Sequence, residues 1–214
     1  DKAVLVVPIS DGDPLTNLLV DTDAVIDFST PEAVEKLVSE VLRRPGPFPV
    51  FVFGSTGWKV SLIRKVEDLS QRTLVLQSAN FSTGVLVLQE ALKAIAPVLE
   101  KTGYTPVIVE SHHKMKRDTP SGTAVSIQRT LVSGGPGNVQ THSIRAGGIV
   151  GEHDVIFYGP GEKLCFSHHA SDRSIFARGA IEAALWLSHR STISPVKSGM
   201  FTMESFFRER YLRP

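Results

Sequence analysis

The chain has 214 residues, 42% of them hydrophobic and 21% charged, and a net charge of +1 from 23 basic and 22 acidic side chains. This size and composition fit one large globular domain or two small ones, while the balanced charge argues against a broad nucleic-acid surface or a polybasic membrane anchor. The single cysteine, Cys165, excludes an internal disulfide framework and a Cys-cluster zinc site, and it is typical of a reducing cytoplasm. No apolar run approaches the roughly 18 residues of a membrane span, and no signal peptide is visible.

The first half of the chain alternates short apolar runs with helical periodicity. Apolar residues recur at the i, i+3, i+4 spacing of a helix over 31–42 and again over 62–69. Ser29 and Glu32 stand at the spacing of a capping box before the first of these helices. Four runs predict strands, at 4–7, 24–28, 50–53 and 73–77. Strands that alternate with helices predict a parallel sheet of the nucleotide-binding kind.

The pattern changes after Gly84. A helix over 88–99 leads to a strand over 106–110, and Ser121 is the predicted N-cap of a helix over 121–131. Further strands at 142–145, 154–158 and 163–167, a hairpin turn at 159–162, and helices over 177–188 and 205–212 complete the chain. Three strands without a helix between them indicate antiparallel or mixed pairing.

We therefore predict an α/β protein of two domains that meet near Phe81–Gly84. The first is a Rossmann-like, parallel nucleotide-binding domain, formed by residues 1–82 and joined by 174–214. The second, residues 83–173, is an α+β domain with a mixed sheet, for substrate binding and oligomerisation.

The densest chemistry lies at 110–124, where two histidines, two lysines and an arginine fall within six residues before a helix that opens with Ser-Gly-Thr. A helix N-terminus offers free N–H groups and a partial positive charge, so it favours an anion. Gly122 permits a close approach to the backbone, and Thr123 adds a hydroxyl donor. The combination suits a small carboxylate-bearing substrate. A phosphate is an alternative ligand, although the Gly-rich P-loop spacing is absent. The alternative is a solvated charged loop before an ordinarily capped helix.

A histidine in such a loop is a natural proton donor or acceptor near neutral pH. His112 and His113 are the candidates, with a neighbouring lysine to stabilise developing negative charge; alternatively, one of the two packs within the loop. A metal site is not expected, since no His-Glu-x-x-His occurs. His168 and His169 alternate faces if they lie on a strand.

Three predicted strand ends carry small, polar and aromatic residues. Gly54–Gly57 and Ser78–Ser82 each follow a strand, and Phe28 and Ser29 end another. Ligands of open α/β sheets bind beyond the carboxyl ends of the strands. Each signal is weak alone, but their shared position predicts one cofactor cleft.

Several blocks, in order, resemble the bacterial dihydrodipicolinate reductases of lysine and diaminopimelate biosynthesis. They are 25–32, 54–57, 79–85, 110–124, 145–153 and 171–180. The block at 110–124, Glu-Ser-His-His through Lys116 and Asp118 to Pro-Ser-Gly-Thr-Ala, is very specific to that family.

The resemblance implies reduction of 4-hydroxy-tetrahydrodipicolinate, a small cyclic dicarboxylate, by NADH or NADPH. It implies His112 as the acid/base group and Lys116 as the second catalytic residue. The residues implied to hold the substrate carboxylates are His113, Gly122, Thr123 and, as a weaker candidate, Arg173. The residues implied to contact the nicotinamide cofactor are Gly54, Ser55, Thr56, Ser78, Ala79, Asn80 and Phe81. It further implies a homotetramer built through the sheet of the second domain, whose strands 154–158 and 163–167 carry apolar residues on both faces.

The chain departs from the family at its beginning. The family opens with a strand and a Gly-x-x-Gly-x-Met-Gly phosphate loop, and nothing like it precedes Val4. Val4–Val7 and the loop Ser10–Pro14 resemble the family's second strand, so a first βα unit of about 25–35 residues is expected to be missing. The acidic residue that would hold the adenine ribose is not clearly placed, with Asp11 just beyond the expected positions. If that unit is missing, we expect the chain alone to bind NADH and NADPH poorly or not at all, and still to bind a planar pyridine dicarboxylate weakly at Lys116 and Thr123.

Two other functions compete with the reductase. One is a cofactor-free dicarboxylate-binding or regulatory homologue, which the acid/base pair His112 and Lys116 argues against. The other is a nucleic-acid interaction module, which the near-zero net charge and the lack of interleaved aromatic residues disfavour. We expect a cytoplasmic enzyme whose partners are a small-molecule dicarboxylate and copies of itself.

Overall fold

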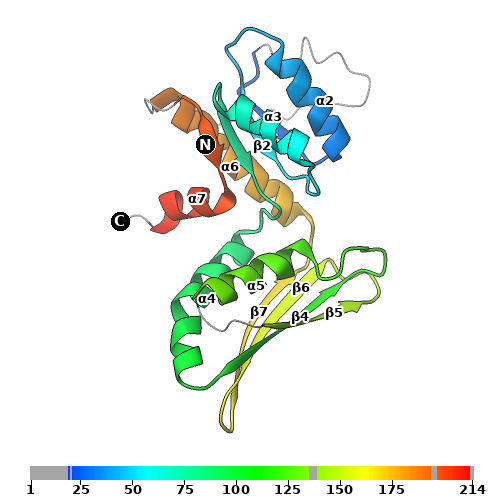
Figure 1. The fold of residues 1–214 in the computed structure, drawn as a ribbon, viewed down its shortest axis with the longest axis vertical. Helices are drawn as coiled ribbons and strands as arrows, with labels where there is room; N and C mark the ends of the chain where they lie inside the picture. Colours follow the sequence, from blue (N-terminus) through cyan, green and yellow to red (C-terminus); the bar gives the residue numbers. More distant parts are fainter. Residues whose placement is uncertain (1–18, 20, 135–138, 194–196, 213–214) are drawn as a thin grey trace.

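The computed structural model describes residues 19, 21–134, 139–193 and 197–212, and within them it contains two separate four-stranded sheets (Figure 1). The strand predicted at 4–7 and the loop predicted at 10–14 lie outside the described residues. Sheet A with the helices packed on it is called the sheet A half, and sheet B with its helices is called the sheet B half.

Sheet A is parallel throughout, with the strand order β1-β2-β3-β8. Its strands are β1 (Ala24–Asp27), β2 (Val50–Phe53), β3 (Leu74–Gln77) and β8 (Gly199–Phe201). The helices of this half are α2 (Pro31–Leu42), α3 (Val60–Ser70), α6 (Ser174–Ile193) and α7 (Met203–Phe207), followed by a π-helical turn, η1 (Arg208–Leu212). The predicted parallel sheet is therefore confirmed.

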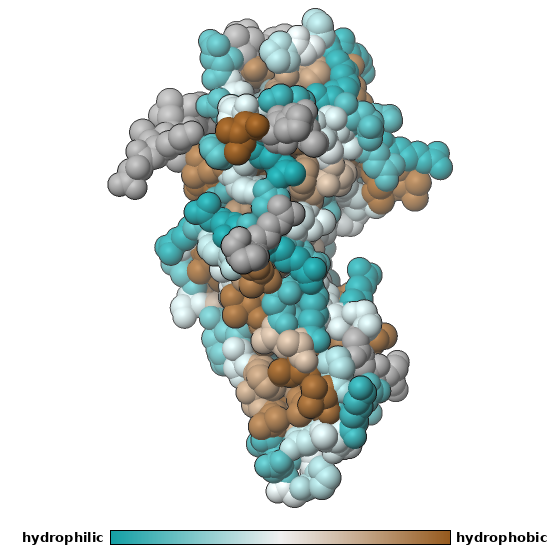
Figure 2. All heavy atoms as spheres, turned by 90° about the vertical axis from the view of Figure 1, so that its left-hand side faces the viewer, coloured by the Kyte–Doolittle hydropathy of each residue, from teal (hydrophilic) through white to brown (hydrophobic). Residues whose placement is uncertain are grey.

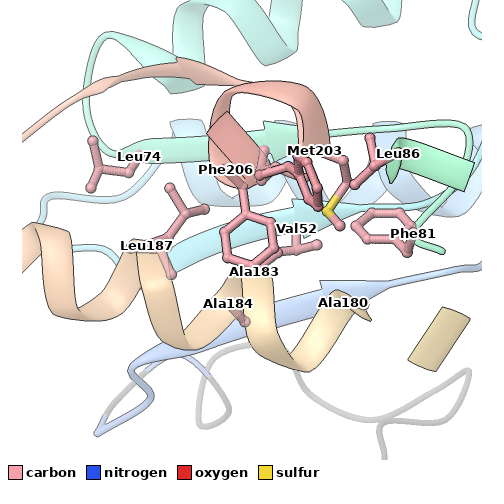
Figure 3. Packing of buried hydrophobic residues seen from close by; sticks show 13 residues of the cluster. Val52, Leu74, Phe81, Leu86, Ala180, Ala183, Ala184, Leu187, Met203 and Phe206 are labelled. Carbon is pink, nitrogen blue, oxygen red and sulfur yellow. The ribbon is translucent and has the colours of Figure 1, made fainter. Parts of the chain in front are cut away.

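Helices cover both faces of sheet A, which explains why the inner strand β2 is apolar at every position. Phe51 and Phe53 of β2 pack toward α2 and α3, whereas Val50 and Val52 pack toward α6 and α7. Figure 3 shows the core between sheet A and helices α6 and α7, where Val52 of β2, Ala183 and Leu187 of α6 and Phe206 of α7 belong to one cluster. A doubly covered parallel sheet is the arrangement that continuous Val and Phe runs favour.

Helix α6 packs very closely on the turn that leaves sheet A. A Cβ placed on Gly179 would lie 1.9 Å from the carbonyl oxygen of Phe81. Only a glycine permits this approach, which brings the helix against the segment that leads into the sheet B half.

Sheet B is mixed, with the order β5-β4-β6-β7. Its strands are β4 (Thr105–His112), β5 (Gln140–Arg145), β6 (Gly151–Tyr158) and β7 (Lys163–Ala170), and its helices are α4 (Thr83–Lys101) and α5 (Gly122–Gly134). Strand β4 is parallel to β5 and antiparallel to β6, and β6 is antiparallel to β7. The mixed sheet and the hairpin between β6 and β7 are as predicted, and Gly159 N donates to Glu162 O across that turn at 3.0 Å.

One face of sheet B holds the core of this half. Leu92 of α4 and Ile127 of α5 pack on Ile108, Val155 and Phe157 of the sheet. Within the described residues, no helix covers the opposite face. Figure 2 shows hydrophobic side chains gathered on the lower part of the molecule, seen from the side on which α4 lies in Figure 1.

Three local predictions need correction. The N-cap of α2 is Thr30, whose Oγ1 accepts from Ala33 N at 3.3 Å, because the Ser29 hydroxyl donates to Asp27 instead. The helix predicted over 205–212 starts at Met203 and continues as the π-helical turn after Phe207. Strand β8 was not predicted at all.

A search of the described helices finds none with the length and apolar composition of a membrane span.

Candidate active site

The polar cluster at the end of β4 is built around the buried carboxylate of Glu110. Strand alternation puts Glu110 and His112 on the same face of the strand, and Glu110 is 0% exposed. Its Oε2 lies 2.5 Å from Nδ1 of His112, and its two oxygens accept from Arg145 Nη2 and Nη1 at 2.7 and 3.0 Å. The backbone N–H of Ser121 completes the set at 3.1 Å. One buried carboxylate thus ties β4 to β5 and to the start of α5.

The pKa values of this pair follow from these contacts. Burial works against ionisation of Glu110, but the hydrogen bonds from Arg145, Ser143, His112 and Ser121 outweigh it and lower the pKa to about 2. Burial also lowers the pKa of His112, and the raising effect of the Glu110 carboxylate does not fully offset it. At neutral pH the pair is therefore a carboxylate facing a largely neutral imidazole.

The helix N-terminus beside this pair is capped as predicted. Ser121 Oγ accepts from Ala124 N at 3.1 Å, and α5 begins at Gly122. Gly122 is exposed, and no atom lies within 4 Å of a Cβ built on it. The start of α5 is thus open to a ligand.

Lys116 lies on the loop between β4 and α5, partly buried and 2.9 Å from the Asp118 carboxylate. Its backbone N donates to His113 O at 3.0 Å, which folds the loop into a turn. Desolvation acts to raise the pKa of Asp118, but the hydrogen bond and the charge of Lys116 lower that pKa below its ordinary value. Arg145 Nη2 also donates to Asp118 O at 2.7 Å, so the loop is fixed to β5.

A row of histidines runs across sheet B from the same point. The rings of His112 and His153 are 5.2 Å apart, and those of His153 and His168 are 5.8 Å apart. His168 Nε2 lies 3.1 Å from Oγ of Ser82, the N-cap of α4. Burial lowers the pKa of His153 to about 3, and the neighbouring charges of His112 and His168 act in the same direction. As expected from alternation, His169 points away and is exposed near Glu152.

The carboxyl edge of sheet A carries the residues predicted for the cofactor. A Cβ on Gly54 would lie 2.4 Å from the ring of Phe28, so the glycine leaves space that an aromatic ring fills. The rings of Phe28 and Phe81 are 5.1 Å apart. Phe28 is 51% exposed, whereas Phe81 is 1% exposed. An apolar, half-open edge at the ends of parallel strands fits the nicotinamide end of a dinucleotide.

The loop after β3 is internally bonded and reaches the other half. Ser78 Oγ donates to Asn80 O at 2.7 Å, and Asn80 Oδ1 accepts from Ser82 N at 2.7 Å. Asn80 Nδ2 donates to Thr123 Oγ1 at 2.7 Å. This bond joins the sheet A edge to the N-terminus of α5, which brings the two predicted sites together.

Other predicted residues take different positions. Ser55 is buried and its Oγ accepts from Trp58 Nε1 at 2.9 Å, so its side chain holds the turn, while Thr56 and Ala79 are exposed. Arg173 is exposed just before α6, and the hydrogen bonds and ion pairs of the described residues do not connect it to the His112 loop.

Glu110, Arg145, His153 and His168 were not predicted to take part in this site. Glu110 could have been found, because a single residue separates it from His112 on a strand and both side chains then share a face. The strand register brings Arg145 opposite His112, and a single sequence does not reveal it. Among the described residues, no three His, Cys, Asp or Glu side chains are grouped so as to hold a metal ion.

Two family models match this chain, one after the other along the sequence. A family model described as the dihydrodipicolinate reductase N-terminus matches residues 2–81, and one described as the C-terminus of the same enzyme matches residues 84–207. Relatives named 4-hydroxy-tetrahydrodipicolinate reductase include one from Caldanaerobacter subterraneus subsp. tengcongensis, 39% identical over 88% of this chain and 78% of its own length. Another, from Thermosipho africanus, is 34% identical over 99% of this chain and 94% of its own length.

A solved structure has the same fold. The dipicolinate-bound dihydrodipicolinate reductase from Paenisporosarcina sp. TG-14 superimposes with a TM-score of 0.70 over 92% of this chain and 80% of that one, at 19% sequence identity. Since both family models match in order and the two together span most of the sequence, the chain belongs to the dihydrodipicolinate reductase family.

Proposed function

We propose that the chain reduces 4-hydroxy-tetrahydrodipicolinate to tetrahydrodipicolinate with NADH or NADPH, a step of lysine and diaminopimelate biosynthesis. Membership of a family of oxidoreductases and the names of the relatives support this reaction. The observation that carries the proposal is the hydrogen bond between Asn80 and Thr123. It joins an edge suited to a nicotinamide to a helix N-terminus suited to a carboxylate, as a hydride transfer between the two requires.

In this proposal the substrate binds at the start of α5. Lys116 and the N–H groups and hydroxyl at Gly122 and Thr123 bind its carboxylates, with His113 beside them and Arg173 as an outer contact. A bound reduced nicotinamide supplies the hydride. The substrate loses its 4-hydroxyl group as water. His112, which is largely neutral at pH 7, first takes up a proton from solvent, and the imidazolium then gives this proton from Nε2 to complete the reduction.

The cofactor in this proposal lies along the carboxyl edge of sheet A. The residues that contact it are Gly54, Ser55, Thr56, Ser78, Ala79, Asn80 and Phe81. The exposure of Thr56 and Ala79 supports side-chain contacts there. The burial of Phe81 and the Ser55–Trp58 hydrogen bond support contact through the backbone of those two residues.

Turnover of purified protein tests the proposal through loss of reduced-nicotinamide absorbance, with NADH and NADPH compared by kcat/KM. His112→Ala is expected to lower kcat by about 10²–10⁴-fold. His142→Ala is the matched control, because His142 is an exposed histidine on β5 of the same sheet. Thr123→Val is expected mainly to raise KM for the substrate. If calorimetry showed binding of pyridine-2,6-dicarboxylate while the protein oxidised neither NADH nor NADPH, the proposed reduction would be wrong and the chain would be a cofactor-free dicarboxylate-binding protein.

We also propose a cytoplasmic homotetramer with a nucleotide-binding domain (1–82 with 174–214) and a substrate domain (83–173). The uncovered face of sheet B supports assembly, since Val107 pairs with Ile156 there and Ile144 and Tyr158 are 47% and 49% exposed. Light scattering tests it. A 23.3 kDa species at micromolar concentration would contradict a tetramer, and Ile156→Glu is expected to dissociate one.

A further inference from the structure

Glu110 is a buried carboxylate to which the proposed reaction gives no role. We propose that Glu110 is a positioning residue: its carboxylate holds the His112 ring through Nδ1–H, so that Nε2 is the nitrogen that exchanges a proton with the substrate. The proton transfer rests on the proposed function, whereas the orientation of the ring can be measured without any substrate.

The first step of the argument is that Glu110 stays ionised. It is fully buried, and burial of an unpaired carboxylate is strongly unfavourable. Arg145 donates to both of its oxygens, in a bidentate pair, and the N–H of Ser121 at the helix N-terminus adds a third partner. Since all these groups donate hydrogen bonds, Glu110 is ionised and its Oε2 can only accept a hydrogen bond from His112.

The second step concerns the ring. An ionised carboxylate 2.5 Å from Nδ1 requires a proton on that nitrogen, so neutral His112 is the Nδ1–H tautomer and Nε2 carries the lone pair. Gly151 on the neighbouring strand makes room for this orientation. A Cβ on Gly151 would lie 3.1 Å from His112 Nε2.

The third step concerns charge. The titratable and charged groups around the His112 ring are Glu110 on its own strand, Arg145 on β5, His153 on β6, and Lys116 on the following loop. Of these, Glu110 alone favours the protonated ring, because Lys116 and Arg145 are cations and burial lowers the pKa of His153 to about 3. Glu110 therefore both fixes the proton on Nδ1 and stabilises the imidazolium from which Nε2 donates.

Glu110→Gln tests the role in turnover. The amide can donate to Nδ1, which favours the wrong tautomer, and it removes the negative charge. We expect kcat to fall on the order of 10- to 100-fold with KM for substrate and nucleotide changed less than about twofold. We also expect the pH profile of kcat, on the limb set by His112, to shift toward lower pH by about one unit or more. Glu110→Asp keeps the charge and is expected to restore the pH limb and part of kcat.

The matched control is Glu90→Gln, which also removes a paired carboxylate. Glu90 lies on α4 and is bonded to Lys93 and Arg208, outside the site. It is expected to leave kcat and its pH profile unchanged.

A direct measurement of the ring covers the case in which the Glu110 variants do not fold. Nitrogen-15 NMR of the unmodified protein near neutral pH should show His112 as the Nδ1–H tautomer, and Glu110→Gln should move it toward Nε2–H. A Nε2–H tautomer in the unmodified protein overturns the proposal, as does a folded Glu110→Gln protein with unchanged kcat and pH profile. An unmodified protein that oxidises no nucleotide but shows the Nδ1–H tautomer contradicts the proposed function and leaves the orientation by Glu110 supported.

Discussion

Replacing Gly179 by alanine sets two effects of opposite sign against each other. Gly179 lies inside helix α6, where alanine is intrinsically favoured over glycine by about 1 kcal/mol. The new Cβ would, however, lie 1.9 Å from the carbonyl oxygen of Phe81, over 1 Å closer than side chains are found to approach. The neighbour is backbone within the buried core rather than the end of a mobile side chain, so helix and loop must separate. Overpacking of this kind typically costs about 1–3 kcal/mol, and the upper part of that range, about 2–3 kcal/mol, applies where backbone must move.

We therefore expect Gly179→Ala to lower the free energy of unfolding by about 1–2 kcal/mol net, or the Tm by roughly 2–8 °C. Because Phe81 belongs to the loop that ends at Ser82, nucleotide affinity should fall as well. Urea unfolding and thermal melts measure the first effect, and nucleotide titration the second. His189→Ala, an exposed change in the same helix, is the control and should alter stability by less than about 0.5 kcal/mol. A higher Tm for Gly179→Ala would show that the packing of α6 on Phe81 is wrong.

Three further outcomes are expected. Burial lowers the pKa of His153 from 6.5 to about 3, so between these pH values the unfolded chain binds more protons than the folded one, and the stability present above about pH 6.5 is lost as the pH falls. Between pH 7 and 4 the urea midpoint of His153→Asn should therefore fall less steeply than that of the unmodified protein, whereas the exposed control His142→Asn should show the same fall as the unmodified protein. Phe206→Ala empties part of the core between α6 and α7 and should cost about 3–5 kcal/mol by urea unfolding, and a loss under 1 kcal/mol would contradict that packing. Asn80→Ala removes the bond to Thr123 and should raise KM for both substrate and nucleotide in steady-state assays, whereas an effect on one alone would show that the bond does not couple the two sites.

Most of the fold could be predicted because its patterns are local. The uninterrupted Val and Phe run of β2 is typical of a strand covered on both faces, and the structure has α2 and α3 on one side of it and α6 on the other. Strand β8 escaped prediction because three residues are too few to show a period, and its pairing with β3 joins positions more than a hundred residues apart. The cap of α2 was assigned one residue early because Ser29 and Thr30 are both good N-caps, and only the bond from Ser29 to Asp27 decides between them.

The candidate site was predictable to the extent that it is continuous in sequence. His112, Lys116 and Thr123 lie within one short segment, whose chemistry can be inferred from its composition. Arg145 and His153 reach His112 through the pairing of β4 with β5 and β6, and strand register is a property of the whole sheet. Side-chain direction was also beyond reach, as for Phe81, whose ring proved to be buried.

The order of the strands along the chain has a consequence for synthesis on the ribosome. Sheet B uses one continuous stretch of sequence that ends at Ala170. Among the described residues, the first strand of sheet A begins at Ala24, and its last strand is complete only when Phe201 has been made. The half that is started first is therefore the half that is finished last, contrary to the usual N-terminal-first order. Until then β3 presents an open edge and the face meant for α6 is bare, so nascent chains that stall between these points expose a surface that invites intermolecular strand pairing.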